Sequence, residues 1–257
     1  MKGFKIKLIA FFVVLLSIAG LVNFLFLKTV FDNIKLSYQT SQESFEKNIF
    51  KLIEQYVTFA QKVIIDTSFK QEVITGLRSK NIGHLNSYLE NIYKRYKVFS
   101  YLAILDDEKN ILTFYPKGTV YSISSSQEDM FTASLKNNTS FISNIISSPI
   151  SEVKYTIEIG SPIKKEKTYG IVIAGLNLKN LSQLLSKVSS GKEIFIVDRI
   201  GNILIHPNLD KIGATLKKDI INKILSRPDK GKIINENIVY YGFSLFKWSL
   251  IRHRQIK

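Results

Sequence analysis

The segment ILDDEKNIL at residues 104–112 is followed ninety-two positions later (196 − 104) by the closely similar segment IVDRIGNIL at residues 196–204. Each copy joins two apolar, β-rich runs through a polar turn that contains aspartate and asparagine. Pro116 or Pro207 closes the second run. This pattern is typical of a β-hairpin. Because the unit occurs twice, it indicates two related sheet-bearing modules in tandem.

An uncharged run of twenty residues lies upstream of the repeat, at positions 8–27. As a helix that rises about 1.5 Å per residue, this run would span roughly 30 Å of hydrocarbon. Three lysines and no acid precede it, so the positive-inside rule places residues 1–7 in the cytoplasm and everything after Lys28 outside. Residues 17–19 resemble a signal-peptide cleavage site, but the apolar run continues beyond them. We therefore expect an uncleaved, single-pass anchor in the inner (plasma) membrane, with most of the chain periplasmic.

The composition limits the classes of function. The 230 residues after position 27 (257 − 27) suffice for one large or two small domains. The net charge is +15, but 36 basic residues are interspersed with 21 acidic ones, so we expect a diffusely basic surface and no nucleic-acid partner. The chain has no cysteine, and none of its three histidines has a partner at metal-ligand spacing. The sequence also shows no phosphate loop or catalytic triad. We therefore expect no metal, no cofactor and no enzymatic activity.

A long amphipathic helix is expected to continue from the apolar run. No glycine or proline interrupts the sequence from about 30 to 65, which predicts a helix of about 35 residues, roughly 50 Å long. Its apolar side chains recur in alternating steps of four and three, at Phe45, Ile49, Leu52, Tyr56, Phe59 and Val63. These apolar side chains must pack against another part of the protein or against a partner. A homodimer through the stalk helix and packing on the chain's own modules both remain open, and they are compatible.

The rest of the chain is expected to form short helices and β-strands. A helix capped by Asp66 or Thr67 and another capped by Asn81 complete the stalk region, 28–98. The membrane-distal module, 99–188, should hold strands at 99–105, 111–115, 140–146, 154–159 and 169–176, with helices near 129–136 and 178–188. The membrane-proximal module, 189–257, should hold a hairpin at 193–206, a helix at 219–225 and strands at 231–234, 238–243 and 248–252. Short turns make antiparallel sheets, so the fold class is α+β with a five-stranded antiparallel sheet in each module.

Several segments, in their order and spacing, resemble the double Cache (dCache) family. They are the two hairpins, Asp129-Met130-Phe131, Ser161-Pro162-Ile163, Gly175-Leu176-Asn177 and the closing Trp248-Ser249-Leu250. The resemblance covers about residues 30–252. It implies the extracytoplasmic sensor domain of a bacterial chemoreceptor, sensor histidine kinase or diguanylate cyclase. In that family a long helix rises from the membrane and carries two PAS-like modules, and the membrane-distal module usually binds a small molecule between its sheet and covering loops.

The resemblance also implies a set of ligand-binding residues in the distal module. Matching positions, with two further aromatic residues as walls, give Tyr101, Phe114, Tyr121, Glu128, Asp129, Met130, Phe131, Ser143, Gly175 and Asn177. Each has a structural alternative: core packing for the aromatic residues and a helix N-cap for Asp129. Asp106, Asp198 and Asn202 are interpreted as turn formers.

The ligand is not expected to be an amino acid. The amino-acid-binding subfamily uses an Arg-x-Trp-Tyr segment and later aspartates. In this chain Glu128 occupies the position of the arginine, and Asn177 that of a late aspartate. An α-carboxylate is best bound by a guanidinium and an α-ammonium by a carboxylate. A site that lacks both would not hold such a zwitterion, so the expected small-molecule ligand is left unidentified.

The sequence therefore predicts a membrane-anchored, extracytoplasmic ligand-sensing domain for transmembrane signalling. Because the chain ends at Lys257, directly after the last predicted strand, we expect it to lack an output domain. It would then be either a truncated receptor or a protein that acts through a separate signalling partner. The alternative is a structural or partner-binding envelope protein. A pilin is a minor case of this alternative, since Leu8 stands where pilins carry a glutamate.

Overall fold

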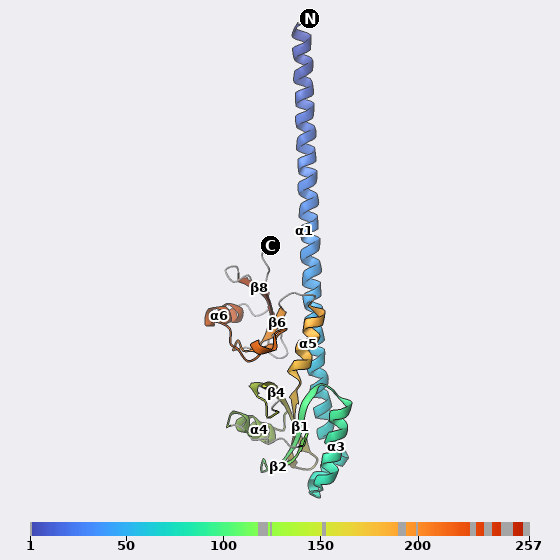
Figure 1. The fold of residues 1–257 in the computed structure, drawn as a ribbon, viewed down its shortest axis with the longest axis vertical. Helices are drawn as coiled ribbons and strands as arrows, with labels where there is room; N and C mark the ends of the chain where they lie inside the picture. The colour runs from blue at the N-terminus through green and yellow to red at the C-terminus, as the bar shows by residue number, and fades with distance from the viewer. Residues whose placement is uncertain are drawn as a thin grey trace. The chain divides into compact units, whose positions relative to one another are not determined.

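The computed structural model describes residues 2–117, 123, 125–150, 153–189, 194–198, 200–226, 230–233, 238–242 and 249–253 (Figure 1). It divides into two compact units, Met1–Asn48 and Ile49–Lys257. One continuous helix, α1 (Lys2–Ser68), begins in the first unit and ends in the second. The predicted passage from an apolar helix into a long amphipathic helix is confirmed.

The first unit is the amino-terminal part of α1, and its described side chains are largely apolar and exposed. Within it the 25-residue segment Val14–Tyr38 is long and apolar enough to cross a membrane, judged by length and composition alone. This segment overlaps the predicted span 8–27, and the side chains before Val14 lie outside the described set. The membrane anchor therefore stays a prediction.

In the second unit, the end of α1 packs on the chain's own fold. Its buried side chains are Ile49, Ile53, Val57, Ala60, Val63 and Ile64. Ile49 and Val63 of the predicted stripe are buried, and Phe45, Leu52 and Tyr56 are partly buried. The prediction is wrong for Phe59, which is 45% exposed, and it missed the buried Ile53 and Val57. The side chains of Ser68 and Ser161 meet at 3.0 Å, which fixes the end of α1 to a strand of the first sheet.

Two short helices follow, α2 (Gln71–Arg78) and α3 (Ile82–Arg95). Asn81 caps α3 as predicted, because its side-chain oxygen accepts a hydrogen bond from the backbone N–H of His84 at 3.1 Å. The cap predicted for α2 is wrong. Asp66 and Thr67 are still inside α1, and Lys70 occupies the N-cap position without a side-chain hydrogen bond.

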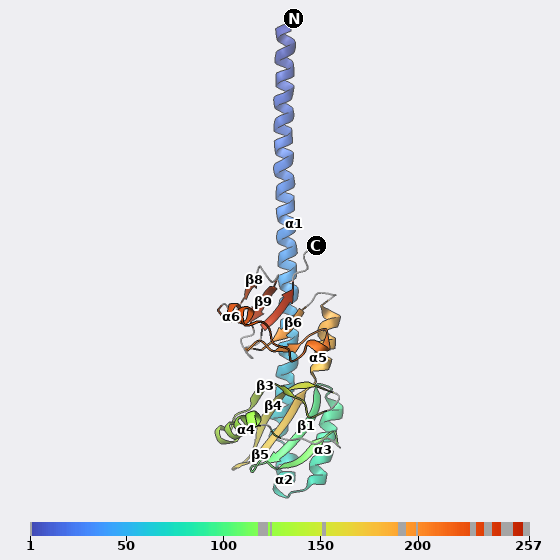
Figure 2. The ribbon, with the colours of Figure 1, turned by 60° about the vertical axis from the view of Figure 1, so that its left-hand side comes forward.

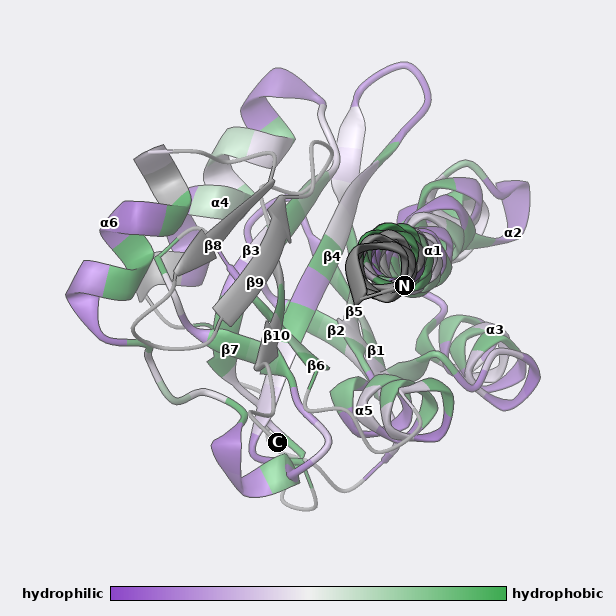
Figure 3. Ribbon diagram, turned by 90° about the horizontal axis from the view of Figure 1, so that it is seen from above, coloured by the Kyte–Doolittle hydropathy of each residue, from purple (hydrophilic) through white to green (hydrophobic). Residues whose placement is uncertain are grey.

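The first sheet has the order β2-β1-β5-β4-β3, with every neighbouring pair antiparallel. Figures 2 and 3 show α2, α3 and the end of α1 on one face of this sheet and α4 (Ser125–Asn137) on the other. The strands are β1 (Phe99–Asp106), β2 (Ile111–Tyr115), β3 (Phe141–Ser147), β4 (Tyr155–Lys164) and β5 (Thr168–Leu176).

Strand β4 is longer than predicted, because it continues through Pro162 to Lys164. Proline lacks the N–H that a strand flanked on both sides would use. At Pro162, however, β4 is paired only with β5, since β3 begins at Phe141, opposite Gly160. The open edge tolerates the proline, and the predicted end of this strand at residue 159 is wrong.

Helix α5 (Leu178–Val188) leads from β5 toward the second sheet, whose order is β7-β6-β10-β9-β8. This order repeats that of the first sheet, and all four strand pairs are again antiparallel. The expected five-stranded sheets are therefore confirmed, and the two hairpins lie in different sheets. The remaining elements are β6 (Ile194–Val197), β7 (Ile203–Ile205), the 3-10 helix η1 (Leu209–Lys211), α6 (Lys218–Ser226), β8 (Lys230–Ile233), β9 (Ile238–Gly242) and β10 (Ser249–His253).

The repeated sequence folds into the same turn twice. In the second copy Asp198 Oδ1 accepts the N–H groups of Ile200 (3.0 Å) and Asn202 (2.9 Å), and its Oδ2 accepts the Asn202 amide at 3.0 Å. Asp106 makes the three corresponding bonds, at 3.0, 2.8 and 3.0 Å. The fourth residue of each turn has a positive φ, +85° at Gly201 and +69° at Lys109. The turn-former interpretation is confirmed.

Replacement of Asp198 with alanine should cost more stability than replacement of Asp106. Both changes remove three hydrogen bonds, but Asp198 is 5% exposed whereas Asp106 is half-buried. Water can therefore replace part of the hydrogen bonds that are lost at position 106. We expect about 2 kcal/mol for Asp198→Ala and about 1 kcal/mol for Asp106→Ala, from typical values for hydrogen bonds to charged groups. Urea denaturation of the two variants measures the difference. Equal losses would contradict the role assigned to burial.

Candidate functional site

The face of the first sheet that α4 covers carries an apolar cluster. Ala103 and Leu105 of β1 and Ile171 and Ile173 of β5 are buried against Phe131 of α4. Four partly buried side chains pack around them: Phe114, Ile123, Leu135 and Phe141. The rings of Phe131 and Phe141 lie 5.5 Å apart. The cluster fixes α4 over the strands and gives this face an aromatic lining.

A buried carboxylate adjoins this cluster. Glu158, in the middle of β4, has no exposed surface. The Tyr101 hydroxyl donates a hydrogen bond to its Oε1, and the Gln127 amide donates to its Oε2 at 2.8 Å. The backbone N–H of Glu158 donates to Ser143 Oγ at 2.8 Å. We call these four residues the Glu158 cluster; it brings β1, β3, β4 and α4 together around one carboxylate.

The strand register explains how Tyr101 reaches this carboxylate. Gly175 of β5 is paired with Tyr101 on one side and with Glu158 on the other. A Cβ atom at Gly175 would lie 2.2 Å from the Tyr101 ring. Because glycine has no side chain, the ring crosses β5 at this position and its hydroxyl meets the glutamate. The ring also stacks on Phe114, with centroids 5.3 Å apart and an interplanar angle of 19°.

A buried carboxylate is costly unless hydrogen bonds or charges compensate it. Each hydrogen bond to a charged group contributes about 1.5–3 kcal/mol, so the Tyr101 and Gln127 bonds offset a substantial part of that cost. An apolar residue at position 158 would need no such arrangement. A buried glutamate with two side-chain donors is therefore a candidate functional group on this face of the sheet.

The structure brings five of the predicted site residues together here: Tyr101 and Ser143 in the cluster, Gly175 beneath the Tyr101 ring, and Phe114 and Phe131 in the aromatic lining. Whether they contact a ligand stays a prediction.

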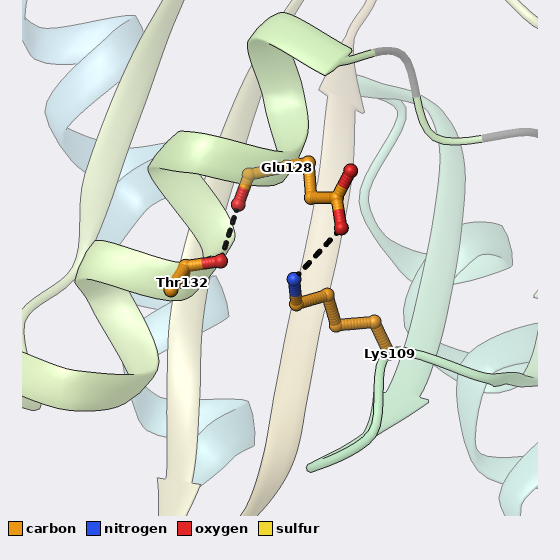
Figure 4. Close-up of polar contacts among 3 residues, drawn as sticks. All are labelled: Lys109, Glu128 and Thr132. Carbon is orange, nitrogen blue, oxygen red and sulfur yellow. Dashed lines mark hydrogen bonds and ion pairs between the residues drawn. The ribbon is translucent and has the colours of Figure 1, made fainter.

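Four other predicted residues lie outside the Glu158 cluster. Glu128 is exposed, and it forms an ion pair with Lys109 at 3.0 Å, while its carbonyl accepts the Thr132 hydroxyl at 2.7 Å (Figure 4). Asp129 is exposed and lies inside α4, which begins at Ser125, so the N-cap expected for it is wrong. Met130 is half-buried in the same helix. Asn177 caps α5 by accepting the N–H of Asn180 at 3.0 Å. Tyr121 lies outside the described residues.

The sequence analysis did not predict Glu158 or Gln127 as site residues. It expected the site to lack a carboxylate, and Glu158 supplies one. The signal for Glu158 is visible in the sequence, because it is the only charged residue in the run TIEIGSPI at positions 156–163. A lone acid in a strand that is otherwise apolar or neutral is a candidate functional residue. Gln127 has no comparable signal, because a glutamine at the start of a helix is common.

A concavity lies on the opposite, helical face of the sheet, with a volume of about 430 Å³. Burial raises the pKa of its Tyr88 hydroxyl, and the negative charge of Glu72 raises it further. Its lining mixes aromatic side chains with charges of both signs: Val63, Asp66, Thr67, Phe69, Lys70, Tyr88, Ile92, Arg95 and Tyr96. Among the described residues, no three His, Cys, Asp or Glu side chains gather in an arrangement that could hold a metal ion.

No protein-family model and no curated protein sequence matches the chain. Solved structures do match its fold. The ligand-binding domain of the Campylobacter jejuni chemoreceptor Tlp3 in complex with L-valine is 15% identical, with a TM-score of 0.63 over 84% of this chain and 92% of that one. The sensor domain of the Vibrio cholerae histidine kinase DctB is 11% identical, with a TM-score of 0.63 over 85% and 97%. The fold is that of a Cache-type sensor domain.

A third structure agrees with this assignment. The ligand-binding domain of the Pseudomonas fluorescens chemoreceptor CtaA in complex with L-serine is 16% identical, with a TM-score of 0.56 over 82% of this chain and 97% of that one. The resemblance to dCache domains is thus confirmed for the fold. These neighbours are ligand-binding or sensor domains and not enzymes. At such low identities the comparison extends to the fold and leaves the ligand open.

Proposed function

We propose that this Cache-type chain is a membrane-anchored, extracytoplasmic sensor, and that its distal module, 99–188, binds a small molecule at the Glu158 cluster. The observation that carries the proposal is the fully buried Glu158, held by Tyr101 and Gln127 on the sheet face under α4. Its support is that a costly buried carboxylate lies beside an aromatic lining in a fold used by ligand-binding domains.

Two hydrogen bonds connect the strands of this site to other parts of the molecule. Strand β4 carries Glu158 and, three residues later, Ser161, which is bonded to Ser68 at the end of α1. Strand β5 runs into α5, whose Ser182 hydroxyl accepts the N–H of His206 at 3.4 Å. A ligand can transmit free energy along these contacts only if it binds two arrangements of the module with different affinities. A ligand that displaces Gln127 would meet this condition, because Gln127 is on α4 and its release would move that helix relative to the sheet.

The membrane part of the proposal rests on the apolar segment Val14–Tyr38 of α1. We propose that this segment anchors the protein in the plasma membrane, and that the same helix passes the signal on. Under this proposal residues 189–257 form the membrane-proximal module, and a homodimer forms through the stalk helix.

A ligand screen on the full chain in lipid nanodiscs tests the proposal. A small molecule at one hundred times its dissociation constant should stabilise the protein by about 2.7 kcal/mol and raise the melting temperature by roughly 5–10 °C. The panel should contain carboxylic acids, amines, amino acids and sugars. The shift should vanish in Tyr101→Phe and persist in Tyr115→Phe, which removes the same hydroxyl from a tyrosine in β2. If no compound shifts the melting temperature, the sensing function is wrong, and a structural role replaces it.

A further inference from the structure

The proposed site combines one buried glutamate side chain with aromatic rings. The carboxylate of Glu158 is buried, and the rings of Tyr101, Phe114, Phe131 and Phe141 lie on the same face of the sheet. Aromatic faces attract cations, by about 2 kcal/mol or more where water is excluded. A carboxylate attracts cations and repels anions. Both kinds of wall therefore favour a positively charged group.

The stretch of sequence that contains α4 and β3 carries little positive charge. Residues 118–153, between Lys117 and Lys154, include α4 and β3 and contain one lysine, Lys136, against the acids Glu128, Asp129 and Glu152. Their net charge is −2 (1 − 3) in a chain whose total is +15. Lys136 is exposed in the last turn of α4.

Lys109, in the turn after β1, is the basic residue that approaches α4, and its ammonium pairs with Glu128 at 3.0 Å (Figure 4). A free carboxylate on a ligand would compete with Glu128 for this lysine, on an exposed surface where an ion pair is worth little. Bidentate recognition of a carboxylate requires an arginine, and residues 118–153 contain none.

We infer that the ligand of the Glu158 cluster is a protonated amine without an α-carboxylate. This inference rests on the proposed function of the site. The ammonium group donates to Glu158 Oε2 and takes the place of the Gln127 amide, which is a neutral donor. The Gln127 amide brings only a dipole to the carboxylate, whereas an ammonium brings a full positive charge, so the exchange adds the attraction of an ion pair. Because Gln127 is on α4, its release also shifts that helix and couples binding to a change in the module.

Matched compounds separate the amine from the carboxylate. Isobutylamine, ethanolamine and phenethylamine are L-valine, L-serine and L-phenylalanine without the carboxylate, and 3-methylbutanoate is L-valine without the amine. Titration calorimetry on the wild-type chain in nanodiscs should show at least one amine binding tenfold or more tightly than its amino acid. The acid should not bind. This comparison needs no variant and so does not depend on the folding of one.

Variants then locate the charge that recognises the amine. Glu158→Gln keeps the size of the side chain and removes its charge, so the affinity for the amine that binds should fall at least thirtyfold. Gln127→Ala removes the competing donor and should raise that affinity several-fold. Glu90→Gln makes the same chemical change as Glu158→Gln at an exposed glutamate of α3 that pairs with Lys94, and it should leave the affinity unchanged. Circular dichroism confirms that each variant is folded.

The outcomes distinguish this inference from the proposed function. If an amino acid binds more tightly than its amine, or if only an acid or a sugar binds, the amine inference is overturned and the sensing function stands. Unchanged amine affinity in folded Glu158→Gln also overturns the inference. If nothing in the wider panel binds, the sensing function is overturned, and the inference with it.

Discussion

Replacement of Phe131 with alanine is expected to lower the free energy of unfolding by about 3–5 kcal/mol, the usual cost of deleting a buried phenylalanine ring. Phe131 has no exposed surface, and it is the buried side chain of α4 in the cluster with Ala103, Leu105, Ile171 and Ile173. The cavity would be bounded by two paired strands, which cannot collapse into it. Stabilities of whole domains are typically about 5–15 kcal/mol, so the loss should release α4 from the sheet.

Urea denaturation followed by circular dichroism measures this loss. Phe131→Leu keeps part of the ring's volume and should cost less than Phe131→Ala. Thr132→Ala changes the next residue of α4, which is exposed, and it should stay within about 0.5 kcal/mol of the wild type. If Phe131→Ala costs no more than Thr132→Ala, α4 is not held on the sheet by this ring.

The second large effect is expected from Gly175→Ala, at about 3 kcal/mol, the upper part of the usual range for an overpacked core. The new Cβ would lie 2.2 Å from Tyr101 Cε1 and 2.7 Å from both Cδ1 and Cζ. The ring cannot simply move aside, because Phe114 stacks on it and Glu158 accepts its hydroxyl. The substitution should therefore break the Tyr101–Glu158 bond and abolish ligand binding as well as reduce stability.

A double-mutant cycle identifies the source of this cost. In a Tyr101→Ala background the ring is gone, so Gly175→Ala should cost less than 1 kcal/mol there. Gly83→Ala in α3 is the matched control, because its Cβ would meet nothing closer than 3.7 Å and alanine favours a helix. An equal cost of Gly175→Ala with and without the tyrosine ring would show that the clash is not its cause.

Features that depend on neighbouring residues could be predicted from the sequence. The Asp-x-x-x-Asn turn forms twice because both hydrogen-bonding partners lie within four residues of each aspartate. Asn81 caps α3 for the same reason, with its partner three residues away. The repeated hairpin then required two sheets, and the order β2-β1-β5-β4-β3 recurs as β7-β6-β10-β9-β8.

Where the predictions were wrong, a partner distant in the sequence decided the outcome. Phe59 of the predicted stripe is exposed, and α1 continues to Ser68, where Ser161, 93 positions later, meets it. The strand predicted at 154–159 continues through Pro162, because β3 leaves that edge of β4 open.

The sequence by itself determined the apolar amino-terminal helix, the turns and the division into two antiparallel sheets, because periodicity and turn chemistry act over a few residues. The tertiary structure alone decided the Glu158 cluster. Tyr101 and Gln127 are 57 and 31 positions away from the glutamate that they hold. No local pattern connects residues at such separations. They meet because strand pairing places Tyr101, Gly175 and Glu158 side by side, and because the Phe131 ring packs α4 onto that face.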